Sequence, residues 1–146
     1  MTWIWGIVLV FLAAAGVWDL RTKSVPLWWL FLGADLAAAV TAGRLAAGEC
    51  SWVTVGLSLA PGILLLLLSF ITRQGVGWGD GLAALAVGAL LGPALLMELM
   101  TAALFMSAAI SAVLLILHRA RKNTRIPFLP MMASAAVFIV ALHPPT

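Results

Sequence analysis

Residues 51–72 read SWVTVGLSLAPGILLLLLSFIT and contain no charged side chain. The hydrocarbon core of a bilayer is about 30 Å thick, and a helix of about 20 apolar residues crosses it. The whole chain has this character, because 64% of its 146 residues are hydrophobic and only 9% are charged. In a soluble domain about a quarter of the residues are charged. The sequence therefore predicts an integral membrane protein embedded in a lipid bilayer.

Five further apolar segments flank this stretch, and charges, glycine or proline separate them. The six predicted segments cover residues 3–18, 27–43, 51–72, 81–97, 99–117 and 126–142. Glu98 separates the fourth segment from the fifth, with a break expected near Gly92-Pro93. The connecting loops are short. We therefore expect an all-α, polytopic membrane protein with about six transmembrane helices, forming one domain over residues 1–146.

The basic residues predict how these helices are oriented. Seven of the eight Lys and Arg residues fall in alternate loops, near residues 19–26, 73–80 and 118–126. By the positive-inside rule these loops lie in the cytoplasm, and both termini then lie outside. The same topology accounts for the net charge of +3, so no nucleic acid partner is expected.

Two aspartates lie at the predicted cytoplasmic boundary. Asp19 follows the first apolar segment, and Asp80 precedes the fourth. A carboxylate at a membrane boundary is costly and is therefore a functional candidate. Two carboxyls on the same side can share a proton and activate a water molecule, which is the chemistry of an aspartyl protease.

Each aspartate also has a purely structural interpretation. Asp19 could pair with Arg21 at a solvated helix end, before Pro26 stops the helix from continuing. Asp80 could be the N-cap of the helix that follows it. Alternating glycines surround this second acid, at positions 75, 77, 79 and 81. Glycine permits a positive φ and close approach, so such a loop could admit an extended peptide beside the carboxylate.

Asp35 is a rival functional acid. It lies in the middle third of the second segment, where a charge is most expensive, and a small transporter would be expected to use it, with broken helices around it. A metal site is not expected, because the chain has one cysteine, Cys50, and its two histidines, His118 and His143, fall on opposite predicted faces.

Three motifs together resemble those of the prepilin peptidases, the type IV leader peptidase family of intramembrane aspartyl proteases. The first, Asp19-x-Arg21-x-x-x-Val25-Pro26, is similar to the family's D-x-R-x-x-x-I-P. The second, Gly77-Trp78-Gly79-Asp80, matches G-x-G-D. The third, RIPFLP at residues 125–130, looks like the I-P-F-x-P stretch that opens the last helix.

The resemblance implies an aspartic endopeptidase with Asp19 and Asp80 as its catalytic dyad. One ionised aspartate would take a proton from water, and the other, protonated, would polarise the scissile carbonyl. Asp80 is expected to ionise more easily, because it lies at a helix N-terminus. Supporting or substrate-binding roles are implied for Arg21, Pro26, Gly77, Gly79, Arg125 and Pro127.

The resemblance also implies a substrate and a location. The substrate would be a prepilin or pilin-like precursor whose short basic leader is cut on the cytoplasmic side of a bacterial inner (plasma) membrane. No metal or organic cofactor is implied. The longer members carry an N-terminal insertion and methylate the new N-terminus. This chain is expected to resemble the short members, which only cleave.

The chain departs from the family pattern at two positions. Leu27 stands where Asn usually follows the proline, and Leu82 stands where Lys usually lies two residues after the aspartate. A Lys beside the carboxylate would favour its ionised form. Two alternatives therefore stay open: a catalytically degenerate homologue, and a non-enzymatic transporter or secretion-system assembly factor.

Overall fold

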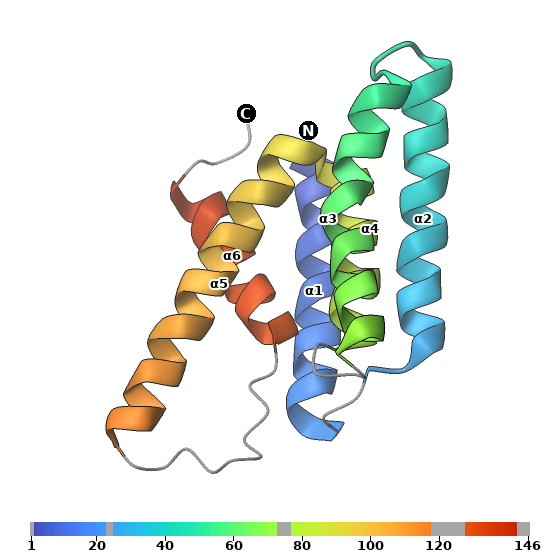
Figure 1. Cartoon of the computed structure of the whole chain (residues 1–146). Helices are drawn as coiled ribbons and strands as arrows, with labels where there is room; N and C mark the ends of the chain where they lie inside the picture. The colour runs from blue at the N-terminus through green and yellow to red at the C-terminus, as the bar shows by residue number, and fades with distance from the viewer. Residues whose placement is uncertain (1, 23–24, 73–76, 118–127, 143–146) are drawn as a thin grey trace.

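A computed structural model describes residues 2–22, 25–72, 77–117 and 128–142. All regular structure in these ranges is helical, which confirms the predicted all-α class. The six helices are α1 (Thr2–Thr22), α2 (Leu27–Ala46), α3 (Trp52–Ile71), α4 (Trp78–Leu91), α5 (Pro93–Ile116) and α6 (Phe128–Leu142). Figure 1 shows a bundle in which α1, α3 and α5 end at the same end of the molecule, where α2, α4 and α6 begin.

The helices differ in length. Four of them, α1, α2, α3 and α5, are long and apolar enough to cross a membrane. The other two, α4 and α6, have 14 and 15 residues, which corresponds to about 21 to 23 Å of helix. The prediction of six apolar helices is confirmed, although only four of them have the length of a full span.

The predicted boundary at Glu98 is wrong. Gly92 alone separates α4 from α5, with φ of 85° and ψ of 174°. This region of backbone conformation is restricted almost entirely to glycine. Pro93 is the first residue of α5, where its fixed φ favours the helix. Glu98 lies inside α5 with its side chain exposed, and an exposed charge does not interrupt a helix.

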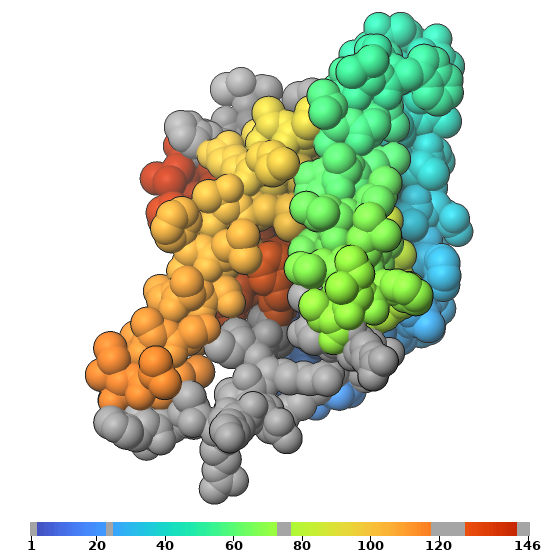
Figure 2. All heavy atoms as spheres, in the orientation of Figure 1, coloured from blue at the N-terminus to red at the C-terminus, as the bar shows by residue number. Residues whose placement is uncertain are grey.

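The short helix α4 lies at the centre of the bundle and packs against each of the other five helices. Its buried residues are mostly glycine and alanine, together with Val87 and two leucines. Small residues let neighbouring helix backbones approach closely, which is how helices associate where both face apolar surroundings. The helices α3 and α5 diverge away from this centre. In the space-filling view, α6 is visible between them (Figure 2).

The closest contact of α4 is with α3. A Cβ built at Gly62 would lie 2.7 Å from the backbone nitrogen of Leu85. One at Gly81 would come equally close to an α3 side chain, and one at Gly88 would overlap the carbonyl oxygen of Ser58. Real Cβ atoms do not approach other atoms this closely, so the packing of these two helices requires glycine at all three positions.

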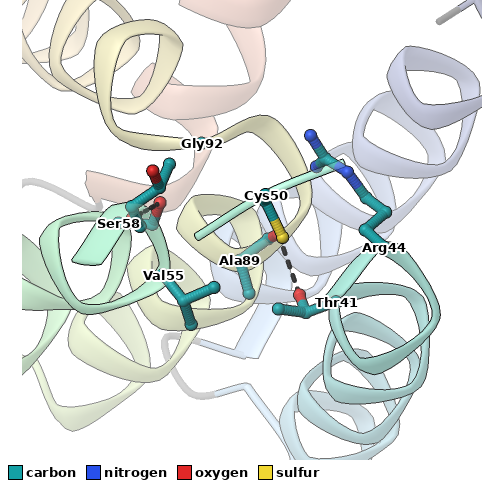
Figure 3. Close-up of a pocket in the computed structure, with 8 residues that line it drawn as sticks. Thr41, Arg44, Cys50, Val55, Ser58, Ala89 and Gly92 are labelled. Atoms are coloured by element: carbon teal, nitrogen blue, oxygen red, sulfur yellow. Dashed lines mark hydrogen bonds between the residues drawn. The ribbon is translucent and has the colours of Figure 1, made fainter. Parts of the chain in front are cut away.

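Side chains of α2 cap the far end of α4. The Thr41 hydroxyl donates to the carbonyl of Ala89 at 3.0 Å, and the Arg44 guanidinium donates to the carbonyl of Leu90 at 3.2 Å. The last carbonyls of a helix lack partners within it, and a cation there also complements the helix dipole. A cavity with room for about one water molecule lies beside them (Figure 3). The end of α4 opposite Asp80 is thus held by hydrogen bonds.

Gly62→Ala is expected to destabilise the fold. The added methyl must displace the α4 backbone at Leu85, and overpacking of this kind costs about 1–3 kcal/mol. The matched control is Gly56→Ala in the same helix, where a Cβ would meet nothing within 4 Å. Thermal unfolding of both variants in detergent, followed by circular dichroism, tests this expectation. Equal melting temperatures for the two variants would contradict the packing described here.

Candidate active site

Asp19 lies in the last turn of α1, with its side chain half-buried. The helix continues through Thr22, so Arg21 follows Asp19 by two residues on the same helix. Side chains with this spacing do not face each other. Arg21 is exposed, and the ion pair found among the described residues is the one between Arg44 and Glu49. The expected structural pairing of Asp19 with Arg21 is therefore wrong.

Asp80 is the third residue of α4, and Gly77 is the N-cap of this helix. The expectation that Asp80 itself is the N-cap is therefore wrong. The carboxylate instead accepts a hydrogen bond from the backbone N–H of Gly77, and the backbone N–H of Asp80 donates to the Gly77 carbonyl at 3.1 Å. A side chain that reaches back from the third helical position in this way forms half of a capping box.

The glycines before and beside Asp80 supply space. Gly77 has φ of −67°, an ordinary value, and Gly79 lies in the first turn of α4. The prediction of a glycine loop with positive φ is therefore wrong at these two positions. A Cβ at Gly77 would lie 3.0 Å from a carboxylate oxygen of Asp80, and a Cβ at Gly79 would touch Leu30 of α2 at 3.6 Å. The absence of a side chain at Gly77 lets the Asp80 carboxyl fold back onto the start of α4. The absence of one at Gly79 lets α2 pack against the same turn.

The two aspartates interact electrostatically. Burial, together with the negative charge of Asp19, raises the pKa of the Asp80 carboxyl to about 6, against the lowering effect of the Gly77 N–H. Asp80 lies at the start of α4, outside the four long spans. The helix N-terminus was expected to make Asp80 easy to ionise, and that expectation is wrong because burial and a like charge have the larger effect.

A third helix packs beside Asp19. A Cβ at Gly16, one turn before this aspartate, would lie 3.2 Å from the Cα of Pro130 in α6. Pro130 is the last residue of the third motif, so the described end of this motif packs one helical turn from Asp19. Sequence reasoning did not single out Gly16. The signal that could have identified it is a glycine three residues before a candidate catalytic acid, on the same face of the helix.

The remaining predicted site residues divide into two groups. Pro26 is the N-cap of α2 with extended ψ of 131°, and its carbonyl accepts the backbone N–H of Trp29 at 3.1 Å. The prediction that this proline separates two helices is confirmed. Arg125 and Pro127 lie outside the described residues, as does Gly75.

Chemically, the arrangement offers two interacting carboxyls at one end of a membrane bundle. One of them has a pKa close enough to neutrality to exchange a proton. Within the described ranges there is no group of three or more His, Cys, Asp or Glu side chains that could hold a metal ion. Acid–base chemistry is what this pair of side chains can supply.

An all-helical integral membrane protein with an interacting pair of acids is the class that the fold and the site define. The type IV leader peptidase family matches residues 6–117, and the chain belongs to this family. The match includes both aspartates and ends before the third motif at residues 125–130. Comparisons with curated proteins and with solved structures returned no significant match.

Asp19→Asn is expected to lower the pKa of Asp80 from about 6, because it removes the negative charge that raises it. The value should stay above the ordinary value of 3.8, since burial remains. Carbon-13 NMR of labelled aspartate carboxyls measures the titration, and Asp35→Asn is the control. An unchanged Asp80 titration in Asp19→Asn would show that the two carboxyls do not interact.

Proposed function

We propose that this chain is an aspartic endopeptidase that removes the leader of prepilin or pilin-like precursors, with Asp19 and Asp80 as the catalytic dyad. The observation that carries the proposal is the electrostatic interaction between these two carboxyls in a member of the type IV leader peptidase family. The two aspartates are far apart in the sequence, so their interaction depends on the fold. Asp19 does not pair with Arg21, so an ion pair with Arg21 does not explain its presence.

In the proposed reaction, one carboxylate takes a proton from water, and the water oxygen attacks the scissile carbonyl carbon. The other carboxyl, protonated, donates a hydrogen bond to the carbonyl oxygen. The C–N bond then breaks, and a proton passes to the leaving nitrogen. Because burial and the charge of Asp19 raise the pKa of Asp80, we assign Asp80 the protonated role and Asp19 the role of base. The two carboxyls titrate as a coupled pair.

The proposed orientation places this site at the cytoplasmic face of a bacterial inner membrane, with both termini outside. Support comes from the basic residues, seven of eight of which fall in the alternate loops at the aspartate end. A precursor with a short basic leader would present its cleavage site at this face. Residues 1–146 act as one peptidase domain in this proposal.

The supporting residues have different proposed roles. Gly77 and Gly79 make room for the Asp80 carboxyl and for α2, and Pro26 sets where α2 begins. Arg21 is exposed and does not face Asp19, which suits contact with the precursor rather than orientation of the acid. The substrate-binding roles of Arg125 and Pro127 remain predictions from the family resemblance.

The transporter alternative depends on Asp35 and has less support. A transport site is expected on broken helices that line a pathway through the bundle. Asp35 lies on α2, which is continuous from Leu27 to Ala46, and its side chain is exposed on the outside of the bundle. This geometry favours the peptidase.

The degenerate-homologue alternative depends on Leu82. In the structure its side chain packs against the hydrophobic core of the bundle. It follows Asp80 by two residues on one helix, so it does not face the carboxyl. A leucine here therefore has a packing role, and the proposal does not require a lysine.

Asp19→Asn and Asp80→Asn are each expected to abolish leader removal, because each removes one member of the proton-transferring pair. Such losses amount to at least about a hundredfold in rate. The test co-expresses each variant with a pilin-like precursor that carries a short basic leader and follows the size shift on a gel. Asp35→Asn is the matched control and should process normally. Intact processing in either dyad variant would refute the proposal.

Leu82→Lys is expected to lower stability and to leave cleavage no faster, because it places a charge against the apolar core. Leu82→Met, which conserves volume, should behave like the unmodified chain in both assays. Melting temperature and cleavage rate are measured side by side. A gain in cleavage rate with Leu82→Lys would instead support the degenerate-homologue alternative.

A further inference from the structure

Two leucine side chains close over the first turn of α4, which carries Asp80. A Cβ built at Gly79, the residue before this acid, would lie 3.6 Å from a methyl carbon of Leu30 and 3.9 Å from a methyl carbon of Leu129. Leu30 belongs to α2 and Leu129 to α6, and both residues are almost completely buried. Two helices from different parts of the chain therefore meet beside the acid.

The residue after Asp80 is covered as well. A Cβ at Gly81 would lie 2.7 Å from the side chain of Leu66 in α3, and Gly81 is buried. The first turn of α4 thus has apolar side chains from α2, α3 and α6 against it. The Asp80 carboxyl itself accepts a hydrogen bond from the backbone N–H of Gly77, at the start of the helix.

Asp19 is the charged group that acts on Asp80 among the described residues. The helices α3 and α6 contain no charged residue. The other charged side chains of the six helices are exposed or are bound to the far end of α4; they are Arg21, Asp35, Glu98 and Arg44. Apart from Asp19, no charged side chain in the described ranges therefore acts on this turn.

We propose that Leu30 and Leu129 are positioning residues for the catalytic pair: by covering the first turn of α4, they keep water from the Asp80 carboxyl and hold this acid in its protonated form. Because the protonated role of Asp80 belongs to the proposed function, this role of the leucines rests on that function. Leu129 occupies the unspecified position of the third motif, which thereby also gains a role.

Apolar neighbours favour the neutral form of a carboxyl. An ionised carboxylate loses its hydration among leucine side chains, whereas a protonated carboxyl loses much less. Burial is the largest cause of the raised pKa of Asp80, ahead of the charge of Asp19, and the Gly77 N–H opposes both. Loss of a covering leucine admits water to the acid, which stabilises the ionised form and lowers the pKa.

Leu129→Ala and Leu30→Ala are each expected to lower the pKa of Asp80 by about one pH unit, out of the rise from 3.8 to about 6. The matched control is Leu96→Ala in α5. Leu96 is also buried, but it packs against Gly88, about two turns along α4 from Asp80. Its loss should lower the melting temperature to a similar extent and leave the Asp80 titration unchanged. Carbon-13 NMR of labelled aspartate carboxyls measures this titration without a substrate.

Leader cleavage across the pH range gives a second readout, which a purely structural role would not change. If Asp80 must be protonated, the pH above which cleavage declines should move down by about one unit in Leu129→Ala and stay in place in Leu96→Ala. Leu129→Met conserves volume and apolar character, so it should keep the profile of the unmodified chain. If the alanine variants do not fold, valine at the same positions removes less of the side chain and should give smaller shifts in the same direction.

Equal Asp80 titrations in Leu30→Ala, Leu129→Ala and Leu96→Ala would overturn the proposal. A lowered titration without the matching shift in cleavage would also overturn it, because the leucines would then not act on the reaction through Asp80. Cleavage that survives Asp80→Asn would instead refute the proposed function, and the titrations would still decide whether the leucines exclude water.

Discussion

Glycines 62, 81 and 88 let the backbones of α3 and α4 approach more closely than any side chain would permit. Gly81 directly follows Asp80, so the contact that holds α4 in the bundle also fixes the first turn of this helix. The other end of α4 is held by the hydrogen bonds from Thr41 and Arg44. Because α4 is short and is held at both ends, the position of Asp80 in its first turn is fixed.

The environment of Asp80 follows from this placement. Burial disfavours the ionised carboxyl, and the single backbone N–H from Gly77 compensates only in part. Asp19 reaches the same region from α1, and the contact of Gly16 with Pro130 brings α6 beside it. Two acids that would each be well solvated at an isolated helix end therefore influence each other. This coupling is what a protonated and an ionised carboxyl working together require.

Much of this architecture could be predicted from the sequence. The helix class, the number of apolar helices and the grouping of Asp19 with Asp80 at one end follow from hydropathy and the alternation of basic loops. The boundary near Glu98 was misplaced because a charged residue can lie on an exposed helix face, whereas Gly92-Pro93 changes the backbone itself. A glycine-proline pair is thus the stronger signal.

The details of the site could not be predicted, because they depend on neighbouring helices. The alternating glycines around Asp80 predict a loop that could admit an extended peptide, yet Gly79 and Gly81 lie inside a helix and serve its packing. The balance of burial against the helix N-terminus at Asp80 needs three-dimensional contacts. The contact between Gly16 and Pro130 joins residues from opposite ends of the chain, so which helix packs against Gly16 depends on the three-dimensional arrangement of α1 and α6.

The central claim is that Asp19 and Asp80 act as one catalytic unit, and a double-mutant cycle on leader cleavage tests it most directly. Rates are measured for Asp19→Asn, Asp80→Asn and the double variant with the same precursor. If the two acids form one unit, the double variant retains the same residual rate as either single variant, because removing one member already disables the pair. A double variant slower by the product of the two single effects would contradict the dyad.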